Sequence, residues 1–421
     1  MIATRALPAL TLSLFACLAA CSSFASLVAC SSGETTAGTN ENTGKARSAV
    51  IKGKPSDSSQ DAVVLLVHYD PATRSFGQCT GTLLAPRLVL TARHCVGDTD
   101  AFAACKSDGT PIAAGVIRKN HKAETMYVFT GKDRPEFGRG EVEPAGQGMK
   151  ILDDGGKNLC NHDIALIVLK EPVKDAQIAP IRLDADVEVG EMITAVGWGV
   201  TEKTPQPDQR MQRKNVKITT VGPDRSQGSV PSNEFEVGES ICSGDSGGPA
   251  ITQETSAVVG VVSRGGNAQG SESSNPAANC IDGRNLYTKI SPFKELIMRG
   301  YELAEAEPWI EGGPDPRKLK PKEACASGDE CRSALCLPDP DAAEETTCAE
   351  DCSATETCSV EGELCTAEGD SMVCRAPKPP PPPPAASTGM CSGVPARSPG
   401  FGGASIVLGL LALATLRRKR S

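Results

Sequence analysis

Aromatic residues and histidine are scarce in this chain of 421 residues. Phe, Trp and Tyr together make up 4 % of it, and there are only four histidines. Glycine and proline are plentiful instead, with 42 and 31 residues. This composition favours short strands joined by turns, followed by extended linkers, over a helical protein. The shortage of histidine also leaves few candidates for a general base near neutral pH.

An excess of basic residues is absent as well. The chain has 52 acidic and 43 basic residues, a net charge of −9, which argues against nucleic acid as a partner. Its 18 cysteines argue against an ordinary reduced cytosolic protein and indicate an oxidising compartment. The length allows two or three domains, with ample room for one full core.

Residues 242–249 read Cys-Ser-Gly-Asp-Ser-Gly-Gly-Pro. A serine hydroxyl such as that of Ser246 is a weak nucleophile until a base takes its proton and donors stabilise the oxyanion that it creates. The glycines on both sides allow backbone N–H groups to converge without a Cβ in the way. A simple Gly/Ser/Pro turn is the alternative interpretation.

This motif resembles the serine signature of the chymotrypsin-like, or trypsin-family, peptidases. His94 stands in Leu-Thr-Ala-Arg-His-Cys, similar to the family's Thr-Ala-Ala-His-Cys with Arg93 in place of the second alanine. Asp163 begins Asp-Ile-Ala-Leu, which is similar to another strand of the family. The order His94, Asp163, Ser246 is that of the family and differs from subtilisins and α/β-hydrolases. Taken singly, His94 could be structural and Asp163 a capping residue, but three ordered matches disfavour this.

The resemblance implies a role for each residue of the site. Asp163 would orient His94 and stabilise its imidazolium, and the N–H groups of Gly244 and Ser246 would form the oxyanion hole. Ser263 matches the family's serine that supports the aspartate and binds the substrate backbone. This chemistry requires no cofactor, and no metal site is expected.

The other three histidines are not expected to act as the base. His162 adjoins Asp163, but neighbours along a strand face opposite sides. His68 and His121 have no motif around them, so we interpret both as structural or surface residues.

Asp245 corresponds to the family's zymogen switch, which pairs with the ammonium group that activation cleavage frees. The matching start is Val50, because residues 50–53 read Val-Ile-Lys-Gly, a weak version of the usual Ile-Val-Gly-Gly. Ala49 precedes it, so a trypsin-like activator is not implied. Cleavage between Ala49 and Val50 is the resulting hypothesis.

The resemblance says less about specificity. Ser240, six residues before the nucleophile, occupies the pocket-floor position, where trypsin-like enzymes carry an aspartate. Glu239 is adjacent but is expected to point elsewhere, and Arg264 replaces a common tryptophan. Gly265 and Asn285 are expected to bind substrate, with Asn285 on the pocket wall. We therefore predict a neutral pocket that accepts apolar or medium-sized residues.

The resemblance also implies disulfides that clamp the histidine loop and frame the specificity pocket. The two remaining cysteines of the domain pair by elimination. The predicted pairs are Cys79–Cys95, Cys242–Cys280 and Cys105–Cys160.

Short β-branched and apolar stretches recur at intervals of tens of residues, which argues for an all-β barrel or sandwich. The resemblance implies two six-stranded antiparallel β-barrels over residues 50–311, closed by a helix over 292–305. The expected strands are 62–69, 79–84, 88–92, 164–169, 193–199, 257–263 and 285–290.

The chain after this domain changes in composition. Proline and charge mark a linker over 312–324, and residues 325–374 then contain eight cysteines and few apolar side chains. Covalent staples must hold such a module together. Zinc is the competing use of clustered cysteine, but no histidine or Cys-x-x-Cys pair occurs here, which favours four disulfides. Their pairing stays open. Residues 375–390 form a proline-rich linker, with polyproline II structure expected at its six consecutive prolines.

Residues 1–30 form a secretory signal with two lipobox-like sites for lipidation, Cys21 and Cys30. The usual signal length favours Cys21, whereas the polar residues after Cys30 favour that site. A plain cleaved signal is the alternative. Residues 31–49 are expected to be a disordered tether or propeptide.

The C-terminal residues 391–421 contain a cysteine, a short apolar run and a basic end. The run is at the short limit for spanning a bilayer, and the basic cluster would hold its end in the cytoplasm. This layout resembles the Myxo-CTERM sorting tails of myxobacterial surface proteins. A GPI signal is the eukaryotic alternative, which the basic terminus disfavours.

The sequence therefore predicts a secreted, membrane-tethered serine endopeptidase of the bacterial cell envelope or surface. It would act on proteins or peptides, be held by an N-terminal lipid, the C-terminal tail or both, and be shed if both are removed. One rival is a catalytically inactive, protease-like binding protein that displays the cysteine-rich module for adhesion. A metal-binding surface protein is a third alternative.

Overall fold

The computed structural model describes residues 50–377, except 139–141, 227–228, 268–274, 276 and 343. The chain divides into two compact units, the first ending at Gly313 and the second beginning at Pro314. The predicted signal, both lipidation sites, the run of prolines and the sorting tail lie outside the described residues.

Six strands of the first unit close into a barrel in the order β10-β11-β4-β3-β2-β9. Strand β11 is buried at all five positions, as expected for a continuous apolar run, and β2 pairs with β3 over its whole length. The strands are β2 (Val63–Asp70), β3 (Ser75–Ala85), β4 (Leu88–Thr91), β9 (Met126–Phe129), β10 (Gly146–Leu152) and β11 (Ala165–Leu169).

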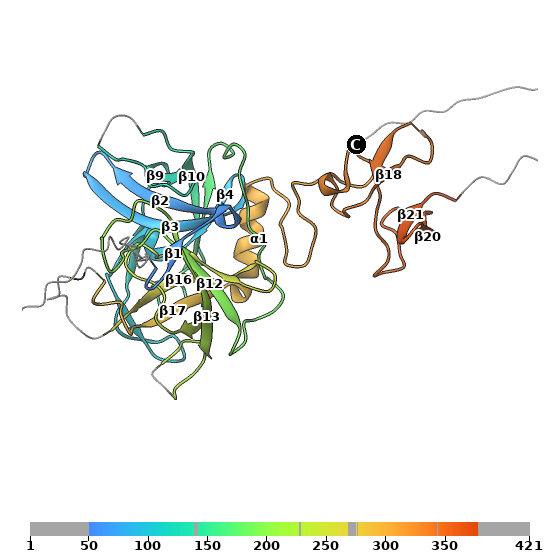
Figure 1. Ribbon diagram of the computed structural model, residues 1–421. Coiled ribbons are helices and arrows are strands. Elements are labelled where there is room, and N and C mark those ends of the chain that lie inside the picture. Colours follow the sequence, from blue (N-terminus) through green and yellow to red (C-terminus); the bar gives the residue numbers. More distant parts are fainter. Residues whose placement is uncertain are drawn as a thin grey trace, which may run out of the picture. The chain divides into compact units, whose positions relative to one another are not determined.

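A second group of strands forms a sheet in the order β1-β13-β12-β15-β16-β17-β14, and an additional β13–β14 pairing closes six of them into a ring. Strand β1 (Lys54–Pro55) attaches to the outside of β13. The ring comprises β12 (Met192–Gly197), β13 (Met211–Val221), β14 (Glu234–Val237), β15 (Pro249–Thr252), β16 (Val258–Gly266) and β17 (Arg284–Lys289). The prediction of two six-stranded antiparallel barrels is confirmed (Figure 1).

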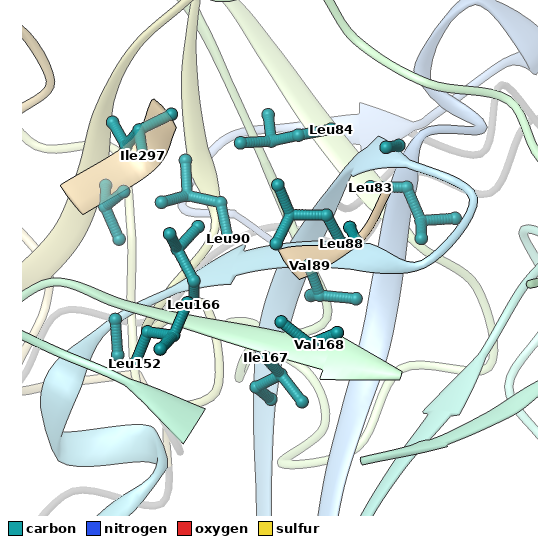
Figure 2. Packing of buried hydrophobic residues seen from close by; sticks show 14 of the residues in the cluster. Leu83, Leu84, Leu88, Val89, Leu90, Leu152, Leu166, Ile167, Val168 and Ile297 are labelled. Atoms are coloured by element: carbon teal, nitrogen blue, oxygen red, sulfur yellow. The ribbon is translucent and has the colours of Figure 1, made fainter. Parts of the chain in front are cut away.

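The C-terminal helix of this unit, α1 (Lys294–Leu303), packs on the first barrel. Ile297 is fully buried among leucines and valines of β3, β4, β10 and β11 (Figure 2). At Gly300 the helix approaches the barrel so closely that a Cβ would lie 2.6 Å from Cδ1 of Leu166. The helix, which lies near the C-terminal end of this unit, therefore completes the core of the first barrel.

An inserted segment between β4 and β9 was not predicted. It consists of two nested antiparallel pairs, β5 with β8 and β6 with β7. The strands are β5 (Gly97–Thr99), β6 (Ala103–Cys105), β7 (Pro111–Ala114) and β8 (Ile117–Asn120). We call residues 96–121 the arch. The Cys105–Cys160 disulfide ties it to the chain just before Asp163.

The second unit contains two short hairpins. They are formed by β18 (Cys336–Pro338) with β19 (Thr346–Cys348), and by β20 (Leu364–Glu368) with β21 (Ser371–Arg375). Its disulfides are Cys325–Cys336, Cys331–Cys348, Cys352–Cys365 and Cys358–Cys374. Each half of the unit thus joins its first cysteine to its third and its second to its fourth. All eight sulfurs are in disulfides, so none is left as a thiolate ligand for zinc.

The predicted linker over 312–324 belongs largely to this second unit. Leu319 forms a bridge with Cys331, and the Lys322 N–H donates to the Cys348 carbonyl at 2.8 Å. These backbone pairings start the unit at Pro314 rather than at Cys325. Within the described part of the chain, no helix is both long and apolar enough to cross a membrane.

Candidate active site

His94 and Asp163 are brought together by neighbouring strands of the first barrel. His94 lies in a short 3-10 turn directly after β4, and Asp163 directly precedes β11, which pairs with β4. Nδ1 of His94 is 2.9 and 3.1 Å from the two carboxylate oxygens of Asp163, and the His94 backbone N–H donates to Oδ1 at 3.0 Å. Asp163 therefore fixes the position of His94 through two groups, the ring nitrogen Nδ1 and the backbone N–H.

The second barrel completes the surroundings of Asp163. The Ser263 hydroxyl donates to Asp163 Oδ2 at 2.6 Å, and the Thr288 hydroxyl donates to the Asp163 carbonyl at 3.1 Å. Burial alone would raise the pKa of Asp163, but the charge of His94 and the hydrogen bonds to His94 and Ser263 lower it overall. Burial would likewise lower the pKa of His94, but the charge and hydrogen bond of Asp163 raise it overall. Each group thus favours the ionised form of the other.

The segment around Ser246 turns sharply. Gly244 and Gly247 have φ values of 98° and 79°, which favour glycine. The N–H groups of Asp245 and Gly247 donate to the carbonyls of Cys242 and Val262. No acceptor within the described residues is recorded for the N–H groups of Gly244 and Ser246. An oxyanion hole needs two such backbone N–H groups, without an acceptor of their own, close to the serine hydroxyl.

Ser246 and His94 line one cavity of about 730 Å³, together with Ser263, Gly265 and Asn285. The Ser246 carbonyl accepts a hydrogen bond from the Thr80 N–H at 2.8 Å, which ties the serine segment to the first barrel. The residues predicted as base, orienting carboxylate and nucleophile thus meet where the two barrels adjoin.

Comparison with known proteins agrees with this geometry. The family model described as Trypsin matches residues 53–297. The chain belongs to the trypsin family. It is a serine-type endopeptidase, a hydrolase.

The chain is similar to several snake venom proteins over part of its length. It is 29 % identical over 238 residues to beta-fibrinogenase mucrofibrase-5 of Protobothrops mucrosquamatus, covering 53 % of this chain and 79 % of that protein. It is 28 % identical over 231 residues to thrombin-like enzyme elegaxobin-1 of Protobothrops elegans, covering 52 % and 84 %. It is 28 % identical over 266 residues to snake venom serine protease Haly-2 of Gloydius brevicauda, covering 60 % and 87 %.

The three predicted disulfides of the peptidase unit are confirmed, two of them implied by the trypsin-family resemblance and one assigned by elimination. They are Cys79–Cys95, Cys105–Cys160 and Cys242–Cys280. Cys95 of the first disulfide directly follows His94 in the sequence. Both cysteines of Cys242–Cys280 line the cavity.

Asp245 is fully buried beside the serine. Its carboxylate accepts hydrogen bonds from the N–H groups of Gly199 at 2.8 Å and Cys242 at 2.9 Å. Burial raises the pKa of Asp245 to about 7, although these two N–H groups and the charge of Arg134 oppose the shift. Val50, its predicted partner, is also fully buried and has a φ of 51°, which is strained for a β-branched residue.

The structure separates the predicted specificity residues into two groups. Gly265 and Asn285 line the cavity, whereas Ser240 is fully buried and is not among the cavity-lining residues. Glu239 points away, as expected: Oε1 is 2.7 Å from Nζ of Lys52, and Oε2 accepts from the N–H of Asp282 at 2.6 Å. Asn285, rather than Ser240, therefore presents the polar group at this wall.

Arg264 forms a contact that no motif in the sequence indicates. It binds both carboxylate oxygens of Glu234, at 3.0 and 2.6 Å, and approaches the Ser263 hydroxyl at 3.2 Å. Glu234 is fully buried. The Arg264 charge lowers the pKa of His94, opposing Asp163. The residue that replaces the family's tryptophan thus belongs to the electrostatics of the site.

The arch supplies a further wall of the cavity. Residues 97–103 line it, including Phe102, whose side chain is 64 % exposed. Asp98 and Asp100 also line it, and both lie against Arg118, at 3.6 and 2.6 Å. No sequence motif marks this segment, so only its position after His94 could have suggested it.

The remaining histidines have other partners. His162 pairs with Asp154. His68 and His121 stack with their ring centroids 3.7 Å apart, and burial is the largest cause that lowers the pKa of His121 to about 4. His121 nevertheless lines the cavity, where a neutral ring is expected.

Proposed function

We propose that Ser246, His94 and Asp163 form the catalytic triad of this endopeptidase. The supporting observation is the pair of contacts from the Asp163 carboxylate to Nδ1 and to the backbone N–H of His94. With Nδ1 occupied, Nε2 is the nitrogen that can accept the proton of Ser246 in the shared cavity.

In this mechanism the Ser246 oxygen attacks the peptide carbonyl while His94 takes its proton. His94 then returns the proton to the leaving amine, and water hydrolyses the acyl-enzyme in the same manner. Asp163 stays ionised and stabilises the imidazolium. The N–H groups of Gly244 and Ser246 receive the oxyanion.

We propose a neutral specificity pocket. No carboxylate is available at the pocket-floor position: Ser240 occupies it, and Glu239 is bonded to Lys52 instead. A lysine or arginine side chain would have to be buried there without a counter-charge, which is unfavourable.

We further propose that cleavage before Val50 activates the enzyme. A new ammonium group near Asp245 would hold its carboxylate ionised, replacing the present situation in which burial raises its pKa to about 7. Cleavage at this bond would also separate the enzyme from any lipid on Cys21 or Cys30. The predicted C-terminal tail would then be the remaining anchor of a secreted, envelope-bound enzyme.

A fluorophosphonate probe tests the triad directly. We expect the matured protein to be labelled at Ser246, and Ser246→Ala to abolish both labelling and peptide hydrolysis. Ser243→Ala, a change at a nearby serine of the same cavity, is the matched control and should leave labelling intact. Absence of labelling that depends on Ser246 would overturn the proposal and favour the inactive, adhesive protein.

A further inference from the structure

The amide side chain of Asn285 is held across one wall of the active-site cavity. Asn285 lies on β17 between Val237 of β14 and Gly265 of β16. Its Nδ2 donates to the Gly238 carbonyl at 2.9 Å. Since a carbonyl can only accept, this bond fixes the amide with its nitrogen toward Gly238 and its oxygen the other way.

The oxygen of this amide lies against Gly265. A Cβ on Gly265 would be only 2.1 Å from Oδ1, so glycine is needed for this approach. Asn285 is fully buried, and no hydrogen-bond donor within the described residues reaches Oδ1. Buried polar atoms normally have a partner. An acceptor without one, on a residue that lines the cavity of Ser246, indicates that its partner is a ligand.

Apolar groups and paired charges line the cavity beside Asn285. Ile241, Val262 and the Cys242–Cys280 disulfide are the apolar groups, and the two arginines of the lining, Arg264 and Arg284, are paired with Glu234 and Glu236. The carboxylates that line the cavity, Asp98 and Asp100, belong to the arch and are paired with Arg118. Oδ1 of Asn285 is thus a neutral acceptor without a partner, in a cavity whose described aspartates and arginines are already paired.

We infer that Asn285 makes this enzyme prefer substrates whose P1 residue, on the N-terminal side of the cleaved bond, has a short, uncharged side chain with an N–H or O–H donor. This class comprises Asn, Gln, Ser and Thr. The inference rests on the proposed function and replaces its general neutral pocket with a defined chemistry. Asn285 acts on selection of the substrate and takes no part in the chemical step.

The physical reason is the state of Oδ1 after the substrate binds. A P1 donor that reaches Oδ1 gives it the partner that it lacks in the free enzyme, whereas an apolar P1 residue leaves it unpaired. Selectivity that depends on a hydrogen bond to a buried group exceeds selectivity by size alone. Lysine and arginine carry donors as well, but they bring a charge for which the described residues of this wall supply no free carboxylate.

Matched peptide substrates test this inference in the wild-type matured enzyme. Asn and Leu have similar shapes at P1, as do Thr and Val, and the members of each pair differ in the donor. We expect kcat/KM to be about 10- to 100-fold higher for Asn than for Leu, and to favour Thr over Val. Peptides with Arg, Lys or Phe at P1 should be cleaved less well than the Asn peptide.

Asn285→Leu removes the acceptor while keeping the branched shape of the side chain, and it should abolish the Asn-over-Leu preference. Asn279→Leu is the matched control: Asn279 lines the same cavity but is exposed, and this change should preserve the preference. The rate of fluorophosphonate labelling at Ser246 reports separately whether the catalytic machinery is intact.

The outcomes separate the two proposals. Labelled enzyme that cleaves the Leu peptide as well as the Asn peptide, or prefers Arg or Lys, overturns the role of Asn285 and leaves the triad standing. Enzyme without labelling or hydrolysis overturns the triad and this inference with it. If Asn285→Leu fails to fold, the wild-type ratios for the two substrate pairs decide the question alone.

Discussion

At the scale of single residues, Asp163 connects the two barrels. Its carboxylate contacts His94 of the first barrel and Ser263 of the second, and its carbonyl accepts from Thr288. A buried carboxylate is stable only when its oxygens are satisfied. The same contacts that keep Asp163 ionised therefore hold the base in position.

This arrangement predicts the pH dependence of activity. Protonated His94 cannot accept the proton of Ser246, so activity is lost as pH falls through the pKa of His94. Because the charge and hydrogen bond of Asp163 raise that pKa above 6.5 against the effect of burial, kcat/KM should rise through an apparent pKa above 6.5.

Asp163→Asn provides the contrast. Removing the negative charge should lower the apparent pKa of His94 and reduce kcat by about 10⁴-fold. The pH profiles of wild type and variant, measured on one peptide, check both statements. An unchanged apparent pKa in Asp163→Asn would contradict the interpretation.

At the scale of strands, β14, β17 and β16 lie side by side and carry both the specificity wall and a buried ion pair. Arg264 on β16 reaches across β17 to Glu234 on β14. A fully buried carboxylate without a cation would be costly, which makes the pair a structural requirement of this part of the barrel.

Arg264→Ala should therefore destabilise the protein by about 3–5 kcal/mol, since it leaves the buried Glu234 charge uncompensated. The double variant Arg264→Leu/Glu234→Leu should regain most of that loss. Arg284→Ala is the control, because its ion pair with Glu236 is largely at the surface and should contribute at most about 1 kcal/mol. Denaturant unfolding of the three variants measures this, and equal losses for Arg264→Ala and Arg284→Ala would contradict it.

At the level of the whole molecule, negative charge and disulfides are concentrated in the second unit. Residues 325–374 contain 13 acidic side chains and one basic side chain, Arg332. The acidic excess of the chain therefore lies in this module and not in the peptidase. The repeated disulfide pattern makes the module two copies of one small hairpin design, each held by two disulfides.

Cleavage before Val50 would change how the whole molecule is anchored. N-terminal sequencing of probe-labelled enzyme should give a start at Val50, and any other start would rule out the proposed bond. Active enzyme that retains an N-terminal lipid would contradict the proposal that activation leaves only the C-terminal tail as a membrane anchor.

The pKa of Asp245 supplies an independent readout of activation. At about 7 it exceeds the unfolded value of about 3.8, so the uncleaved folded state binds the extra proton between these values. Stability should therefore fall as pH rises from about 4 to about 7. Thermal unfolding of uncleaved Ser246→Ala protein should show this loss, and the form starting at Val50 should show less of it.

The local sequence was sufficient for the features that depend on short motifs. The serine segment, His94, Asp163 and the all-β class each have a local signal in residue type, spacing or alternation. The three disulfides of the peptidase unit were instead predicted from the family resemblance and by elimination. The continuous apolar run of β11 likewise predicts its own burial.

The features that join distant parts of the chain could not be predicted from local sequence. The Arg264–Glu234 pair, the arch over the cavity, the disulfide pairing of the second unit and its start at Pro314 all depend on strand register and chain crossing. The same holds for Asn285: the family resemblance suggested a pocket wall, but its fixed amide and unpaired oxygen arise from contacts with Gly238 and Gly265, which lie on neighbouring segments of the second barrel.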